Sequence, residues 1–195
     1  MANRVGEVIE SGTTEFIAQC YELHEAPPFG SLVRVGDGSL AVYGLVYNVT
    51  TASLDPGRRP IARGKDEEDE AAVFRNNPQL AKLFRTDFTC LVAGYGIAGQ
   101  VHHFLPPAPP RVHAFVYECT VEEVAAFTMS LDFLSSLLSS GFSGPGDELA
   151  AAFLRLAGKA RIDDNGFLVR AGKELAVLLS GDLRRLNAIL RRMRP

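Results

Sequence analysis

Three glycines in the stretch LVAGYGIAGQ have the spacing of a dinucleotide-binding fingerprint. Gly94, Gly96 and Gly99 follow an apolar run, and Glu118 lies about twenty residues downstream, where that fingerprint has its acidic residue. In such a site a helix begins at the glycines, because its N-terminus binds the pyrophosphate. Here four prolines follow within 106–110, and proline removes amide donors and fixes φ. The glycines therefore predict a tight turn or a strand bend, and we expect no nucleotide cofactor.

Histidines and serines also occur, but not at the spacings that metal sites or nucleophilic catalysis require. His102 and His103 are adjacent, so on an extended segment their side chains point to opposite faces and do not share a metal ion. None of the three Gly-Lys pairs is followed by Ser or Thr, as a phosphate-binding P-loop requires. The serines between 130 and 143 lack the G-x-S-x-G turn of a hydrolase nucleophile. We therefore assign no catalytic residue, no cofactor and no metal site.

The C-terminal stretch DLRRLNAILRRMRP is the most basic part of the chain. Its apolar residues recur at helical spacing, with the arginines on another face. Three interpretations stay open: a helix packed on its neighbours with cations near its negative end, contact with an acidic protein surface, or contact with nucleic acid or an anionic membrane. The lack of interleaved aromatic residues disfavours nucleic acid. The candidate contacts with an anionic partner are Arg184, Arg185, Arg191 and Arg192.

Composition and charge are those of an ordinary globular protein. The 195 residues are 47% hydrophobic and 22% charged, with a formal net charge of −3, which is not the balance of a general nucleic-acid binder. No run approaches the roughly 18 apolar residues that a membrane-spanning helix needs. The opening MANRVGEVIESG lacks the apolar core of a signal peptide. Because the three cysteines are far apart, as suits a reducing compartment, we expect a cytoplasmic protein.

Strand-like segments fill residues 1–119. Short runs rich in Val, Ile, Tyr and Thr are separated by Gly, Pro, Asp and Ser, which is typical of a β-barrel or sandwich. An insert at about 66–86 is predicted to be helical, and its own apolar residues predict that it packs.

Helical segments fill residues 120–195. Thr120 and Glu123 form a predicted capping box at the first helix, and Asp147 is expected to cap a second one. The predicted fold class is α+β: a small Greek-key-like β-barrel with a helical insert, followed by an α-helical C-terminal region.

Three motifs occur in order in the strand-rich part. They are the opening RVGEVIESGTTEFIAQCYEL, the turn and strand PFGSLVRVGDG, and the strand AVYGLVYNVTT. Together with the helical insert and the RTDFTCLVAGY that follows it, they resemble the HAS-barrel. This small N-terminal barrel is shared by HerA-type DNA-translocating ATPases and by the head subunits of ATP synthase. In the HerA-type proteins an ATPase core with a P-loop follows the barrel, whereas here the helical region follows.

The resemblance implies an assembly role, and it does not carry over ATP hydrolysis or DNA translocation. Barrels of this kind crown a ring or dock a partner. We therefore expect a non-enzymatic binding or assembly module that docks on a protein partner, with a HerA-like ATPase or a nuclease in DNA processing as the implied partner and a homo-oligomer left open. One alternative is a nucleic-acid-associated accessory protein that uses the basic C-terminal helix. Another is an enzyme of unrecognised type, which a deep pocket with ionisable groups of perturbed pKa would favour.

Overall fold

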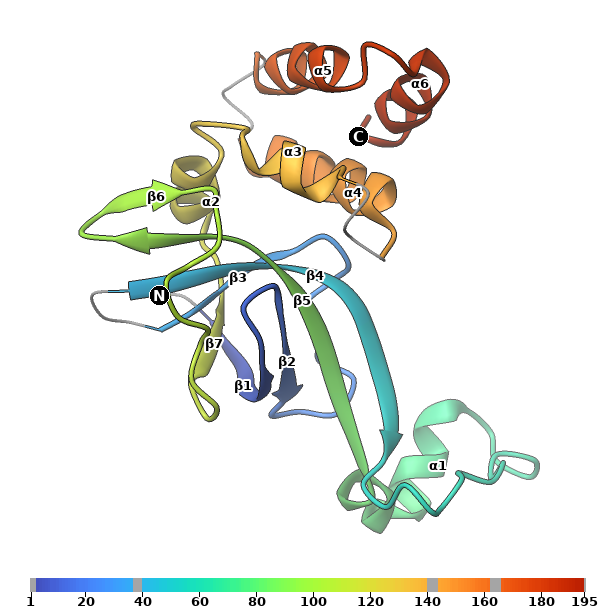
Figure 1. Cartoon of the computed structure of the whole chain (residues 1–195). Coiled ribbons are helices and arrows are strands. Elements are labelled where there is room, and N and C mark those ends of the chain that lie inside the picture. Colours follow the sequence, from blue (N-terminus) through green and yellow to red (C-terminus); the bar gives the residue numbers. More distant parts are fainter. Residues whose placement is uncertain (1–2, 37–39, 140–143, 162–165, 195) are drawn as a thin grey trace.

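A computed structural model describes residues 3–36, 40–139, 144–161 and 166–194. The strands of this part of the chain are β1 (Arg4–Ser11), β2 (Glu15–Cys20), β3 (Leu32–Val35), β4 (Leu40–Ser53), β5 (Phe84–Ile97), β6 (Gln100–His102) and β7 (Phe115–Glu118). They form one antiparallel sheet in the order β2-β1-β7-β3-β4-β5-β6, and pairing of β2 with β5 closes it into a barrel that leaves β6 outside (Figure 1). The prediction of an α+β fold built on a small β-barrel is confirmed.

Alternating side chains fill the barrel. In β5, Phe88, Cys90 and Val92 are buried, while the residues between them are partly exposed. This is the period of two expected of a strand with one face inside. Phe16 of β2 and Val116 of β7 complete the same buried cluster from other strands. The barrel interior is therefore a packed core made by residues far apart in the sequence.

The fingerprint glycines lie in a strand and a turn, as predicted. Gly94 and Gly96 belong to β5, and Gly99 lies in the tight turn to β6 with a φ of +80°. Gln100 resumes a strand that pairs with the end of β5. No helix begins at these glycines, so they do not present a helix N-terminus to a pyrophosphate.

The helices after the barrel pack on its outside. They are α2 (Val121–Phe127), α3 (Phe133–Leu137), α4 (Gly146–Ala160), α5 (Phe167–Leu178) and α6 (Leu183–Arg192). Leu32 of β3 and Leu45 of β4 belong to the same buried cluster as these helices. In this layer α3 and α4 contact the barrel strands, and α5 and α6 lie beyond them (Figure 1). None of the helices in the described ranges is long and apolar enough to cross a membrane.

The predicted cap at the start of α2 is confirmed, and the predicted cap at the start of α4 is wrong. The Thr120 hydroxyl accepts from the Glu123 amide, and the Glu123 carboxylate accepts from the Thr120 amide, so the predicted capping box is present. Asp147 does not cap its helix, because α4 already begins at Gly146 with Pro145 at the cap position. Its carboxylate instead binds the guanidinium of Arg185 in α6. A partner distant in the sequence thus decides the orientation of this side chain.

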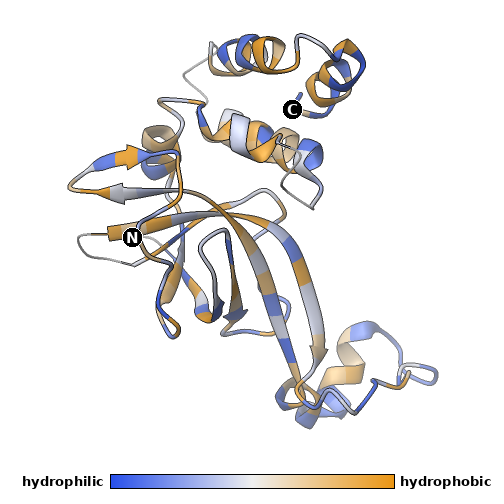
Figure 2. Ribbon diagram, viewed as in Figure 1, coloured by the Kyte–Doolittle hydropathy of each residue, from blue (hydrophilic) through white to orange (hydrophobic). Residues whose placement is uncertain are grey.

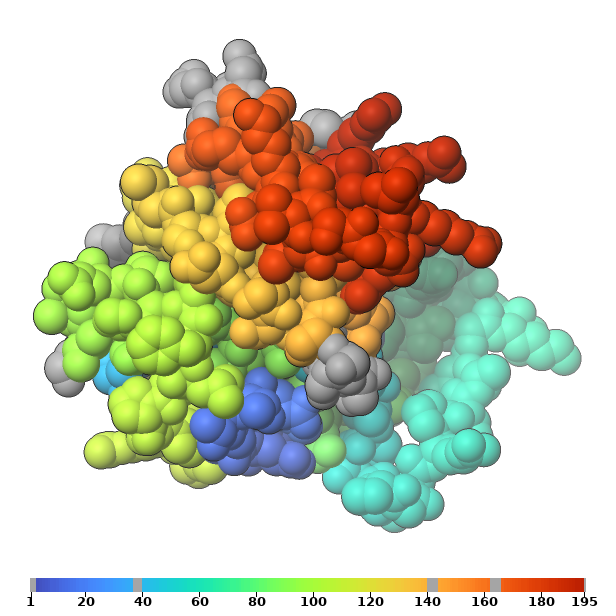
Figure 3. Space-filling view, turned by 45° about the horizontal axis from the view of Figure 1, so that its top comes forward, coloured from blue at the N-terminus to red at the C-terminus, as the bar shows by residue number. Residues whose placement is uncertain are grey.

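A long β-ribbon carries the insert away from the barrel. β4 and β5 pair from Leu40 and Ile97 at one end to Ser53 and Phe84 at the other, whereas β2 covers β5 only between Asp87 and Leu91. The end of the ribbon therefore projects, and it carries α1 (Glu70–Asn76) and the 3-10 helix η1 (Pro78–Lys82). We call residues 48–87 the arm and residues 53–84 the arm tip; Figure 1 shows the arm extending away from α2–α6. In Figure 3 the insert forms a lobe beside the main body.

Candidate docking site at the tip of the arm

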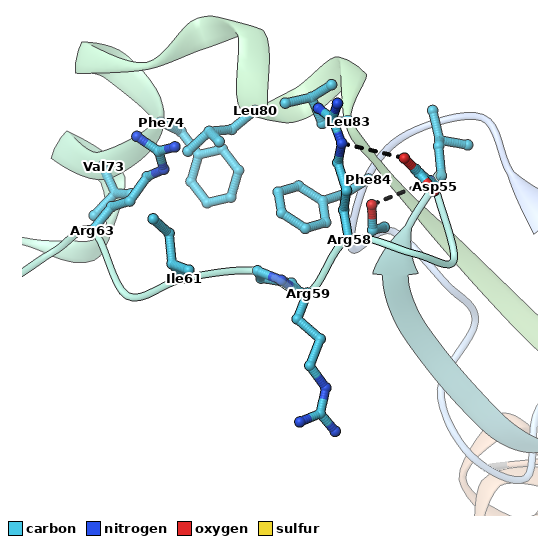
Figure 4. A pocket seen from close by; sticks show the side chains of 13 residues that line it. Asp55, Arg58, Arg59, Ile61, Arg63, Val73, Phe74, Leu80, Leu83 and Phe84 are labelled. Carbon is cyan, nitrogen blue, oxygen red and sulfur yellow. Dashed lines mark hydrogen bonds and ion pairs between the residues drawn. The ribbon is translucent and has the colours of Figure 1, made fainter.

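The arm tip contains an apolar cavity of about 370 Å³ (Figure 4). Leu54 and Ile61 line it from the segment before α1, Phe74 lines it from α1, and Leu83 and Phe84 line it from the return to β5. In Figure 4 the rings of Phe74 and Phe84 and the side chain of Ile61 border the same space. The cavity is thus assembled from residues on both sides of the insert.

Local hydrogen bonds give the tip a defined shape. The Leu54 amide donates to the Leu83 carbonyl at 2.9 Å and closes the end of the ribbon. The Asp69 carboxylate accepts from the Ala72 amide at 2.6 Å and caps α1, which is the role favoured for aspartate at a helix start. Pro78 occupies the first turn of η1, where its missing amide costs nothing. The cavity is therefore bordered by the capped helix α1, by a 3-10 helix that begins at a proline, and by a closed ribbon.

Several large apolar side chains of the tip remain in contact with solvent. The exposed fraction is 71% for Ile61, 48% for Leu54 and Leu83, and 37% for Phe74. Within the insert, Ala72 and Leu80 are buried, so the expectation that the insert packs is met only in part. Figure 2 shows hydrophobic positions in the middle of α1, between hydrophilic ends, beside a mostly hydrophilic loop. A contiguous exposed apolar patch with a polar rim is typical of an interaction surface.

The rim of the cavity has an ordered pattern of charge. The basic block, as we call residues 58–65, consists of Arg58, Arg59, Arg63 and Lys65. It is followed at once by the acidic block, residues 66–70, which consists of Asp66, Glu67, Glu68, Asp69 and Glu70. The basic block contributes lining residues to the cavity, and the acidic block leads into α1, which lines the opposite side.

Part of this charge is neutralised within the tip. Arg58 pairs with Asp55 at 3.3 Å, Asp69 pairs with Arg75 at 3.6 Å, and Glu67 accepts from the Asn76 amide group at 2.6 Å. The side chains of the remaining charged residues of both blocks form no hydrogen bond or ion pair with any residue in the described ranges: Arg59, Arg63, Lys65, Asp66, Glu68 and Glu70. Unpaired charges of both signs therefore lie side by side along one exposed segment.

The arginines predicted as contacts for an anionic partner fall into two groups. Arg185 binds Asp147 of α4 through Nη2 at 2.7 Å and Nε at 2.9 Å, and Arg192 pairs with Glu148 at 3.1 Å. These two side chains attach α6 to α4. Arg184 and Arg191 are exposed and have no ion-pair partner among the described residues. Of the four predicted contacts, Arg184 and Arg191 are therefore available to a partner, whereas Arg185 and Arg192 are held by α4.

A second cavity, of about 390 Å³, lies between the barrel and α3 and has polar residues in its lining. It contains Glu15, His103, Ser136 and Ser139. The His103 ring is hydrogen-bonded to the Phe127 carbonyl at 2.9 Å, and its burial lowers the pKa of the imidazole. The Ser139 hydroxyl donates to the Ser136 carbonyl. Neither Ser136 nor Ser139 is hydrogen-bonded to His103, so the described residues of this cavity show no serine paired with a histidine base.

The other histidines and the cysteines have structural surroundings. His102 packs on the Tyr95 ring, and His113 is hydrogen-bonded to Glu7. Burial raises the pKa of Cys20 to about 11 and also raises that of Cys90, so both thiols are protonated at neutral pH and are weak nucleophiles. Within the part of the chain that the structure describes, no three His, Cys, Asp or Glu side chains are grouped as a metal site requires.

Sequence reasoning did not identify the cavity at the arm tip. Ile61 lies within a segment of arginine, proline and glycine that is typical of a solvated loop, and the lining comes from residues as far apart in the sequence as Ser53 and Phe84. An isoleucine inside a basic block that an acidic block follows at once is the signal that marks the place. No protein-family model and no curated protein matches the chain.

Proposed function

We propose that this protein is a non-enzymatic assembly module that docks on a protein partner through the tip of its arm. The observation that carries the proposal is the exposed apolar cavity at the end of a projecting β-ribbon. Burying several partly exposed aliphatic and aromatic side chains supplies free energy for association, at roughly 25 cal/mol per Å² of apolar surface before the costs of docking are subtracted. Charges around an apolar centre fit the usual composition of a protein interface.

The identity of the partner follows from the resemblance to the HAS-barrel. The closed antiparallel barrel with a helical insert is compatible with that resemblance. Barrels of this family assemble with ATPases and nucleases, so we propose a HerA-like ATPase or a nuclease in DNA processing, in the cytoplasm, as the partner. The helical layer replaces the ATPase core of the family, and any ATPase activity is then supplied by the partner.

The experiment compares two exposed residues in different places. Ile61 at the arm tip and Val177 on α5 are 71% and 70% exposed, so an aspartate at either position leaves the core intact. Proteins that bind the immobilised wild-type chain are compared with those that bind Ile61→Asp and Val177→Asp. The proposal predicts that a specific partner is lost with Ile61→Asp and kept with Val177→Asp. Retention of that partner by Ile61→Asp would exclude the arm tip as the docking surface.

The nucleic-acid alternative has one observation in its favour. Arg184 and Arg191 are exposed without an ion-pair partner in the described residues. If α6 binds nucleic acid, affinity falls steeply with salt, and Arg184→Ala with Arg191→Ala reduces that salt dependence. Fluorescence anisotropy with labelled single- and double-stranded oligonucleotides measures this, and no binding at low salt would remove the alternative.

A further inference from the structure

We infer that the arm tip docks on the arm tip of a second copy of this chain. In this arrangement the basic block of each copy faces the acidic block of the other, and the two apolar cavities meet between them. The inference rests on the proposed function, because it names an occupant for the same surface. It goes beyond that function by stating how two chains are joined.

The order of charges along the tip carries the inference. Arg59 and Arg63 precede Asp66 and Glu68 on one exposed segment, and all four lack partners in the described ranges. A two-fold interface brings the same surface of both copies together, so that residue i meets j and j meets i. A segment that is positive in its first half and negative in its second is complementary to itself when two copies of it lie antiparallel across such an axis.

The same charges disfavour a simply acidic or simply basic partner. An acidic peptide would be attracted by Arg59 and Arg63, but it would also approach the unpaired carboxylates of Asp66 and Glu68. A basic peptide would meet the opposite conflict. Like charges placed together across an interface act against association. An occupant that carries a basic block followed by an acidic block is therefore favoured, and a second copy of this chain carries both blocks in that order.

The apolar surface fits the same arrangement. Ile61 lies between Arg59 and Arg63 and is the most exposed of the large apolar residues at the tip. Across a two-fold axis that passes between the basic and the acidic block, Ile61 of each copy lies beside the axis, and the half-exposed Leu54 and Leu83 at the cavity rim add apolar surface to the same contact. Apolar contact at the centre and ion pairs at the rim are the usual arrangement of an interface.

The size of the tip limits the strength of the dimer. Only the end of the arm takes part, so the interface falls at the small end of specific interfaces, below about 1,200 Å² in total. We therefore expect a reversible dimer with a dissociation constant on the order of micromolar, weaker at high ionic strength because the rim pairs are exposed. The barrel and the helical layer stay free in both copies.

The test is sedimentation velocity over a concentration series of the full chain, with variants of reversed charge. Variant one carries Arg59→Glu and Arg63→Glu, and variant two carries Asp66→Lys and Glu68→Lys. None of these residues caps a helix or belongs to one. We expect each variant alone to dissociate at a concentration at least about tenfold higher than wild type, since attraction becomes repulsion at each pair. An equimolar mixture of the two variants is expected to form a heterodimer.

The matched control has the same change of charge elsewhere. Arg184→Glu with Arg191→Glu alters two exposed arginines of α6 that have no ion-pair partner in the described residues, and we expect it to dimerise like wild type. Circular dichroism confirms that all variants are folded.

Three results would overturn the inference. They are a wild-type chain that stays monomeric throughout the series, equal loss of dimer in the α6 control, and failure of the mixture to restore dimers that each variant had lost. Failure here is distinguishable from failure of the proposed function. If the wild-type chain is monomeric but Ile61→Asp still loses a foreign partner, the arm tip docks proteins and only the second copy is excluded.

Discussion

Replacing Arg185 by alanine tests whether the basic C-terminal helix is held by its arginines. The guanidinium donates to the Asp147 carboxylate through Nε and Nη2, and it also donates to the Leu138 carbonyl at 3.1 Å. Hydrogen bonds to charged groups contribute about 1.5–3 kcal/mol when buried. The Arg185 and Asp147 side chains are 36% and 32% exposed, so solvent screening reduces this value. We expect Arg185→Ala to lower the free energy of unfolding by about 1–2 kcal/mol.

Urea unfolding followed by far-UV circular dichroism measures this loss. For a chain of this size it corresponds to a fall of about 2–8 °C in the melting temperature. Arg184→Ala is the control, because Arg184 is exposed without an ion-pair partner in the described part of the chain; its effect should stay within about 0.5 kcal/mol. A double-mutant cycle with Asp147→Ala should show a coupling of about 1 kcal/mol. Equal effects of Arg184→Ala and Arg185→Ala would refute the assignment of Arg185 to the α4–α6 contact.

Further predictions concern the helical layer and its contact with the barrel. Phe133 is 1% exposed and contacts the rings of His103 and Phe127, so Phe133→Ala should cost about 3–5 kcal/mol in urea unfolding. Gly30 has a φ of +87°, and a Cβ there would lie 2.8 Å from the Ala152 Cβ, so Gly30→Ala should cost about 2 kcal/mol or more; a neutral result would contradict this packing. Burial lowers the pKa of His103 in the folded chain below its ordinary 6.5, so the unfolded chain binds more protons and stability should fall as the pH drops below about 6.5. His103→Gln should flatten this dependence in thermal melts between about pH 5 and 7; an unchanged slope would contradict it.

The β-barrel and the first helix start were predictable because their signals are local. The alternation in β5 around Phe88 and Cys90 gives the period of a strand, and Thr120 with Glu123 caps a helix through residues three positions apart. Asp147 was predicted wrongly for the opposite reason. It has the residue type and position of a cap, yet its carboxylate binds an arginine 38 residues away. The capping preference of aspartate does not show that a distant arginine competes for its carboxylate.

The arm tip was predictable only in part, also for a physical reason. The insert and its apolar residues are visible in the sequence, but whether they become buried depends on what lies opposite them. At the end of the two-stranded ribbon no further layer of the described residues covers Leu54 and Leu83, so both remain half exposed. The predicted set of arginines was divided by a similar effect. Asp147 and Glu148 of α4 pair with Arg185 and Arg192, whereas Arg184 and Arg191 have no ion-pair partner among the described residues.

Site-specific photo-crosslinking tests the central claim, that the arm tip is a protein-docking surface, most directly. A photoreactive phenylalanine analogue replaces Ile61 in one variant and Val177 in a matched one, because both residues are exposed to the same degree. The account predicts a discrete protein adduct from position 61, either a dimer of this chain or a complex with a partner, and no such adduct from position 177. No adduct from position 61, or the same adducts from both positions, would contradict it.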